Sequence, residues 1–202
     1  LQLGIGPVRV SIEAQGDQPT FVWMTQRKPE FGAITEDRLQ AAAALGLDLE
    51  DVREDRLIQT VSTGLPWLFL PLASRGAAAR CRPTSDELQL LCEAMKAEGV
   101  YAFTTDVSSP GAAFHARSFP SPALGGAEDA ATGSAAAPFG AYVARYELLP
   151  RLPEIRFVVE QGVEMRRPSE IHVKVRASGD TIASLAIGGR TVIVGEGAIH
   201  WE

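Results

Sequence analysis

An alanine-rich segment, expected to form one long helix over residues 134–149, most constrains the fold of this chain. Much of the remaining sequence consists of short runs with the alternation of β-strands, separated by turns that contain Gly or Pro. Few of these runs alternate with helices, as a doubly wound parallel sheet would require. The sequence therefore favours an α+β domain in which a curled antiparallel or mixed sheet wraps a helix.

Two further helices have recognisable ends. Residues 36–45 have acids in the first turn and alanines in the middle, and Gly46 follows the end. Thr84 and Glu87 fit a capping box that opens a second helix, which is expected to end at Gly99. Two segments, 29–32 and 74–83, are expected to be loops. The expected strands are 8–13, 20–25, 56–72 with a break at 63–66, 100–105, 114–119, 155–160, 170–176, 181–187 and 191–194.

Charge and composition narrow the functional classes. The chain has 202 residues, with 19 Lys and Arg against 25 Asp and Glu and a formal charge of −6. This acidic balance argues against a general binder of nucleic acid or of anionic membranes. The longest apolar stretch, 65–73, is too short to span a bilayer, and no signal segment opens the sequence. We therefore expect a cytoplasmic protein.

The most informative segment for function is GGAEDAATGSAAAPFGAY at 125–142. The first N–H groups of a helix have no intrahelical acceptors, and the helix dipole is positive there. The small residues Thr132, Gly133 and Ser134 let an anion reach those groups. The pattern predicts a site for a carboxylate or phosphate, with Ser134 capping the helix, donating to the anion, or both. Asp129 is placed to hydrogen-bond a substrate amine or hydroxyl.

The same segment has a purely structural interpretation. In it Ser134 is only an N-cap, Asp129 is a loop acid and Gly133 is a turn residue. Helix capping is far commoner than ligand binding, so the pattern alone favours this interpretation.

The histidines and cysteines give little support for other chemistry. His115 lies in an expected strand, where an outward or core-satisfied histidine is commoner than a catalytic base. His172 alternates with apolar neighbours and is expected to face solvent, and His200 lies near the end of the sequence. No two histidines have metal-ligand spacing, so no metal site is expected. Cys81 and Cys92 are too few for a disulfide scaffold or zinc cluster, and thiol catalysis has weak support for either.

Residues 128–143, EDAATGSAAAPFGAYV, closely resemble the signature of the PhzF family of phenazine-biosynthesis-like isomerases and epimerases, written ED-P-A-T-G-S-A. Two positions depart from the family pattern: Ala130 stands where the family has proline, and Arg166 where it has glycine. Further blocks agree in the same order: VSTGLPWLFLPL at 61–72 with VSTG-x-P, FHARSF at 114–119 with DF-x-x-R-x-F, QGVEMRRPSEIHVKV at 161–175 with QG-x-x-M-G-RPS, and glycine-rich strands from 188 to 197.

The resemblance implies a diaminopimelate-epimerase-like fold. That fold has two pseudo-symmetric lobes, each a curled β-barrel wrapped around a central helix, with the active site in the cleft between them. It also implies a homodimer without metal or organic cofactor that moves protons on a small carboxylic-acid substrate. Asp129 falls on the aspartate of the signature, taken as catalytic, and Thr132, Gly133 and Ser134 fall on the part that holds the substrate carboxylate.

The resemblance also implies a missing part. No segment matches the family's acid/base glutamate or its glycine-histidine motif, which belong to the first lobe. We therefore expect residues 1–18 to be a remnant of the first lobe, 19–188 to form the second lobe, and 189–202 to be strands that return to the first.

Two functions are open at this point. In the first, the protein is a PhzF-like isomerase or epimerase in which a glutamate of the absent lobe moves a proton between carbons of a small acid. In the second, it is a catalytically silent small-acid-binding or interaction protein of the same fold.

Overall fold

The computed structural model describes residues 2–3, 6–178, 181–195 and 197–198, so that His200 lies outside the described residues. The helices are α1 (Arg38–Ala44), α2 (Arg75–Arg80), α3 (Ser85–Met95) and α4 (Gly133–Arg145), with 3-10 turns at Leu49–Asp51 and Pro122–Leu124. The strands are β1 (Gln2–Leu3), β2 (Gly6–Pro7), β3 (Val10–Gln15), β4 (Gln18–Thr25), β5 (Glu30–Thr35), β6 (Ile58–Ser62), β7 (Pro66–Pro71), β8 (Gly99–Thr104), β9 (Phe114–Pro120), β10 (Glu154–Gln161), β11 (Ser169–Ser178) and β12 (Thr181–Arg190).

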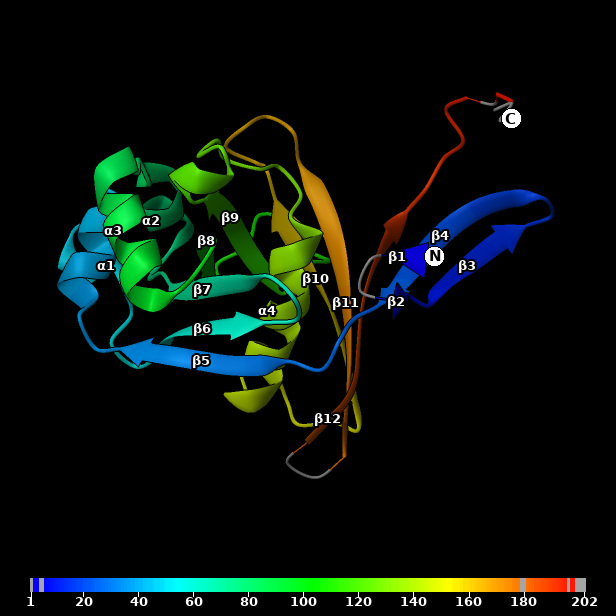
Figure 1. Cartoon of the computed structure of the whole chain (residues 1–202), viewed down its shortest axis with the longest axis horizontal. Helices are drawn as coiled ribbons and strands as arrows, with labels where there is room; N and C mark the ends of the chain where they lie inside the picture. The colour runs from blue at the N-terminus through cyan, green and yellow to red at the C-terminus, as the bar shows by residue number, and fades with distance from the viewer. Residues whose placement is uncertain (1, 4–5, 179–180, 196, 199–202) are drawn as a thin grey trace.

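Ten of these strands form one mixed sheet in the order β3-β4-β12-β11-β10-β9-β8-β7-β6-β5. Neighbouring strands are antiparallel except for the pairs β7–β8 and β9–β10, which are parallel. Figure 1 shows the sheet bending round α4. The helix contacts β6 and β7 toward one end of the sheet and β11 and β12 toward the other. The expected α+β fold with a mixed sheet is confirmed.

Helix α4 lies at the centre of the larger hydrophobic core. Every residue from Ala135 to Val143 is buried, which explains why the helix is built from small and apolar residues. Gly140 permits the closest approach, because a Cβ there would lie 2.6 Å from Cγ1 of Val173. The neighbouring residue Phe139 packs against β8, where its ring centroid lies 4.7 Å from that of Phe103.

Helices α1, α2 and α3 cover the outer face of β6 to β9 and form a second core there (Figure 1). The expected apolar face of α3 is confirmed, since Leu88, Leu91, Cys92 and Met95 are all buried. Each sheet face is thus covered where β6 to β9 run, with α4 on one side and three short helices on the other.

The structure corrects several expected boundaries. Residues 74–83, expected to be a loop, contain α2, whose N-cap Ser74 accepts a hydrogen bond from the N–H of Ala77. Strand β5 overlaps the loop expected at 29–32. Helix α3 ends at Met95, followed by the C-cap residue Lys96 with a left-handed φ of 49°, and does not extend to Gly99. Helix α4 ends at Arg145, and residues 191–194 form no strand.

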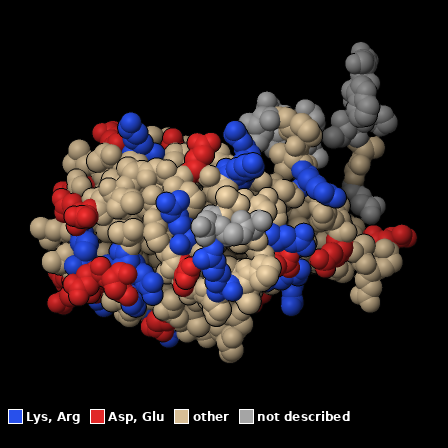
Figure 2. All heavy atoms as spheres, turned by 90° about the horizontal axis from the view of Figure 1, so that it is seen from below, with Lys and Arg blue, Asp and Glu red and all other residues tan. Residues whose placement is uncertain are grey.

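The hairpin of β3 and β4 stands away from the rest of the molecule and is joined to it through β12 (Figure 1). Strand β3 has no buried residue, and Ile12 on it is 63% exposed. On the face shown in Figure 2, basic and acidic side chains are interspersed. None of the helices in the described ranges has the length and hydrophobicity that a membrane crossing requires.

Candidate functional site

The N-terminus of α4 presents hydrogen-bond donors. Thr132 is the N-cap residue, and its carbonyl oxygen accepts from the N–H groups of Ala135 and Ala136. The N–H groups of Gly133 and Ser134 have no acceptor among the described residues. Ser134 is the second residue of the helix and is exposed, so of the roles left open for it, capping is wrong and donation to an anion stays a prediction. Two backbone donors without a described partner and the hydroxyl of the exposed Ser134 therefore lie at the positive end of the helix dipole.

Asp129 lies beside this helix end. Its side chain is exposed, and its Oδ2 accepts a 2.7 Å hydrogen bond from Oγ1 of Thr132. Its backbone N–H donates to the carbonyl oxygen of Ser118 on β9 at 3.1 Å. Its Oδ1 accepts a longer hydrogen bond, of 3.4 Å, from the N–H of Ala131. Each carboxylate oxygen can accept one more hydrogen bond, from a ligand that also reaches the N–H groups of Gly133 and Ser134.

Gln161, at the end of β10, fixes the segment between Asp129 and the helix. Its side chain is fully buried. Nε2 donates to the carbonyl oxygen of Asp129 at 2.6 Å and to Oγ1 of Thr132 at 3.0 Å. Oε1 accepts from the hydroxyl of Tyr101 at 3.1 Å and from the N–H of Thr132 at 3.3 Å. All four hydrogen-bonding positions of the Gln161 side-chain amide have partners, and a fully satisfied buried network of this kind is rigid.

Arg117 and Glu128 anchor the same segment from its other end. The guanidinium of Arg117, on β9, is 5% exposed and donates in a bidentate manner to Glu128, at 2.8 Å from Nε and 2.7 Å from Nη2. Nη1 donates to the carbonyl oxygens of Ala78 and Cys81 at 2.7 and 3.2 Å. Glu128 directly precedes Asp129, so this ion pair holds the start of the segment that approaches α4.

The loop of residues 162–168, between β10 and β11, packs against this segment. Ser169 Oγ donates to the carbonyl oxygen of Ala130 at 2.8 Å. Arg166, where the resemblance led us to expect glycine, adopts a left-handed φ of 56°. Its side chain is exposed and needs no space in the core. The backbone conformation that favours glycine is therefore kept with an arginine in place.

Replacing Arg166 by glycine is expected to stabilise the protein by about 0.5–1 kcal/mol, because a left-handed conformation is strained for a residue with a Cβ. Urea denaturation monitored by circular dichroism measures the change. The neighbouring substitution Arg167→Gly is the control, because residue 167 is not among those with a positive φ and glycine there only adds freedom to the unfolded chain. Equal destabilisation by both substitutions would contradict the prediction.

His172 is partly exposed and the two cysteines are buried. As expected, His172 alternates with the buried residues Ile171 and Val173, but its side chain is only 27% exposed, because the ring of Phe21 packs edge-on against it with centroids 4.9 Å apart. Both cysteines are buried, and burial raises the pKa of Cys81 and of Cys92 to about 12. A thiol with such a pKa is not a nucleophile near neutral pH.

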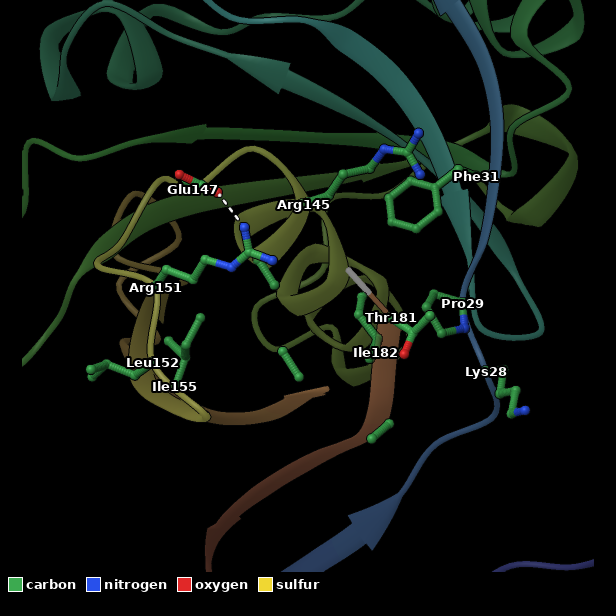
Figure 3. Close-up of a pocket in the computed structure, with 13 residues that line it drawn as sticks. Lys28, Pro29, Phe31, Arg145, Glu147, Arg151, Leu152, Ile155, Thr181 and Ile182 are labelled. Atoms are coloured by element: carbon green, nitrogen blue, oxygen red, sulfur yellow. Dashed lines mark hydrogen bonds and ion pairs between the residues drawn. The ribbon is translucent and has the colours of Figure 1, made fainter. Parts of the chain in front are cut away.

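A hollow of about 800 Å³ lies at the other end of α4. Figure 3 shows the guanidinium of Arg145 beside the ring of Phe31, at 4.3 Å from its centroid, and Arg151 bonded to Glu147. Within the described part of the chain, Glu147 is the only carboxylate that lines the hollow, and it is paired. The helix N-terminus with Asp129 therefore remains the better candidate site.

The sequence identified four of these residues, and the structure brings them together: Asp129, Thr132, Gly133 and Ser134. The buried partners that hold them were not identified as site residues. Arg117 and Gln161 were noted only within family-like blocks, and the pairing of each depends on which strands become neighbours.

A model of the PhzC-PhzF family, described as phenazine biosynthesis-like protein, matches residues 1–197. The chain is 31% identical over 176 residues to the uncharacterized isomerase YfhB of Bacillus subtilis, covering 87% of this chain and 58% of that protein. It is 28% identical to the trans-2,3-dihydro-3-hydroxyanthranilate isomerase of Pseudomonas aeruginosa, over 99% of this chain and 66% of that protein. A crystal structure of the phenazine biosynthesis protein of the PhzF family from Bacillus anthracis superposes with a TM-score of 0.80 at 24% identity, covering 94% and 64%.

The mixed sheet bent round a buried helix is thus a fold found in solved PhzF structures. This chain belongs to the PhzC-PhzF family. It spans about six tenths of the length of the first curated relatives that it matches.

Proposed function

We propose that this chain supplies the carboxylate-binding part of a PhzF-type isomerase or epimerase that moves a proton between carbons of a small carboxylic acid. One observation carries the proposal: the N–H groups of Gly133 and Ser134, which have no acceptor among the described residues, follow shortly after the exposed Asp129, whose carboxylate is hydrogen-bonded to the N-cap residue Thr132. This arrangement provides donors for an anion and an acceptor for an amine or hydroxyl at the N-terminus of one helix. Family membership and relatives named as isomerases support the reaction class.

In this proposal each residue has a separate role. The backbone N–H groups of Gly133 and Ser134 and the hydroxyl of Ser134 hold the substrate carboxylate, helped by the helix dipole. Thr132 keeps Asp129 in place through their 2.7 Å hydrogen bond. Asp129 orients the substrate by accepting from its amine or hydroxyl. Holding both ends of a small acid in this way fixes the carbon that loses its proton.

The base that moves the proton belongs, in this proposal, to a part of the polypeptide beyond this sequence. It is a glutamate whose pKa is raised toward neutrality by a closed cleft. Residues 19–188 then form one lobe of a diaminopimelate-epimerase-like protein, with 1–18 and 189–202 as parts of the other. The active protein is a cytoplasmic homodimer that uses no metal or organic cofactor.

Proton exchange with solvent tests this proposal. The whole polypeptide encoded by the gene is incubated in deuterium oxide with trans-2,3-dihydro-3-hydroxyanthranilate and with a panel of small 2-amino and 2-hydroxy acids, and the acids are followed by NMR. Deuterium on a substrate carbon is the expected result. Binding of an acid without any exchange would instead support the silent binding protein, and the enzymatic proposal would be abandoned.

Substitution of the site residues tests their roles. We expect Asp129→Asn and Ser134→Ala each to lower kcat/KM by at least tenfold, because each removes a group that orients the substrate. Asp86→Asn and Ser85→Ala, in the first turn of α3 and exposed, are matched controls that should leave kcat/KM unchanged. An unchanged kcat/KM in both site variants would refute the site assignment.

A further inference from the structure

His115 is held between carboxylates from two different parts of the chain. Its imidazole on β9 is 1% exposed. Nδ1 lies 2.8 Å from Oε1 of Glu160 on β10, and Nε2 lies 3.0 Å from Oε1 of Glu164 in the 162–168 loop. A neutral imidazole carries one N–H and can donate to only one of them. An imidazole with both protons donates to both and joins the loop to the sheet.

The two carboxylates are held unequally. Glu160 also accepts from the N–H and hydroxyl of Ser108, at 2.7 and 2.8 Å, and from the N–H of Ser109 at 2.8 Å. Burial acts to raise the pKa of Glu160, but these donors and His115 outweigh it and lower the pKa to about 2. Glu164 has one side-chain hydrogen bond in the described ranges, to His115, and its buried Oε2 has no partner there. When the imidazole loses one proton, Glu160 keeps its three other hydrogen bonds, and Glu164 loses its hydrogen bond to His115.

The loop that carries Glu164 also positions the candidate site. Ser169, which follows the loop, donates to the carbonyl oxygen of Ala130 at 2.8 Å. At the loop's start, a Cβ on Gly162 would lie 2.8 Å from the same oxygen. Ala130 lies between Asp129 and Thr132, so a movement of the loop reaches the residues proposed to orient the substrate.

We propose that His115 is a positioning residue: while it carries two protons it locks the 162–168 loop against the segment that approaches α4, and when it loses one proton to solvent it releases Glu164 and keeps Glu160. This inference rests on the proposed function in taking that segment as the substrate site. The lock makes the geometry of the site dependent on pH.

Other charged groups act on the lock. Burial acts to lower the pKa of His115, but the hydrogen bonds to Glu164 and Glu160 outweigh it and raise the pKa above its ordinary value of 6.5. Hydrogen bonds from Arg75 lower the pKa of Asp106, and the charge of His115 adds to that effect. The positive charge of Arg117, two residues along β9, helps to lower the pKa of Glu164, and Arg117 is itself paired with Glu128. The lock is therefore complete below the ordinary pKa of a histidine and is lost as the pH rises through the raised pKa.

Two linked measurements on the 202-residue chain test the lock. NMR follows the titration of the His115 ring, and hydrogen exchange follows the amides of Arg166 and Arg167, whose N–H groups bond within the loop at 3.0 and 2.9 Å. We expect the protection factors of both amides to fall at least tenfold as the pH rises through the His115 pKa. Glu164→Gln removes one carboxylate, and we expect it to lower the His115 pKa by about one unit and to move the loss of protection by the same amount.

Two further variants complete the test. Glu170→Gln is the control, because Glu170 lies on β11 with its side chain 57% exposed. It should change neither the His115 pKa nor the pH at which the amides lose protection. Glu164→Asp keeps the charge on a shorter side chain and should give a smaller shift in the same direction. Protection that is independent of pH, or a midpoint that Glu164→Gln leaves unmoved, would overturn the proposal. Neither measurement needs a substrate, so this outcome is separate from the deuterium exchange test.

Discussion

Replacing Arg117 by methionine is expected to lower the free energy of unfolding by about 3–5 kcal/mol. The methionine fills much of the volume of the arginine but leaves the carboxylate of Glu128 without its bidentate partner. It also leaves the carbonyl oxygens of Ala78 and Cys81 without the donors that reach them at 2.7 and 3.2 Å. Each carbonyl keeps a second donor, the N–H of Cys81 for Ala78 and Nη1 of Arg82 for Cys81, so the main cause of the loss is the uncompensated, largely buried charge of Glu128.

Chemical denaturation of three variants isolates this effect. Arg176→Met is the matched control, because Arg176 pairs with Glu154 while its side chain is 63% exposed, and an exposed pair contributes at most about 1 kcal/mol. Adding Glu128→Gln to Arg117→Met removes the stranded charge and should recover part of the loss. If Arg117→Met costs no more than Arg176→Met, the anchoring role given to this ion pair is wrong.

The fold could be predicted from the sequence where the pattern is long. Helix α4 was expected because its small and apolar residues extend over many turns, and all of Ala135–Val143 is buried. Helix α2 was not expected, because its six residues, RGAAAR, have no apolar periodicity beyond alanines. Its formation depends on burial of Ala77 and Ala78 against the sheet, and β5 similarly depends on pairing with β6. Such elements follow from tertiary contacts, which local patterns do not contain.

The candidate site divides in the same way. Asp129 to Ser134 are contiguous, and the properties of a helix N-terminus are local, so this part could be predicted. Glu160 lies 45 residues from His115 in the sequence and meets it through the parallel pairing of β9 and β10. Gln161 lies 29 residues from Thr132 and meets it because Asp129 forms a bridge with Ser118 on β9, beside β10. Without that register, the sequence left His115 as either an outward histidine or one satisfied in the core. The structure confirms the second alternative, with Glu160 and Glu164 as the partners.

Gly162 lies where the 162–168 loop packs against Ala130, and Gly162→Ala is expected to destabilise the protein by about 2–4 kcal/mol. The backbone there has a φ of 77°, which is strained for alanine. The added Cβ would lie 2.4 Å from the carbonyl oxygen of Arg167 and 2.8 Å from that of Ala130. Neither oxygen belongs to a flexible side chain, so the backbone itself must shift.

The same substitution should disturb the site, because the carbonyl of Ala130 moves with its neighbours Asp129 and Thr132. Urea denaturation measures the stability, and the amide chemical shifts of Gly133 and Ser134 report on the N-terminus of α4.

Gly111→Ala is the control, because no atom of the described residues lies within 4 Å of its added Cβ and Gly111 is not among the glycines of positive φ. We expect it to change stability by less than about 0.5 kcal/mol. A Gly162→Ala protein as stable as the control, with unchanged shifts at Gly133 and Ser134, would show that the loop does not press on the site, and the coupling between the loop and α4 would have to be abandoned.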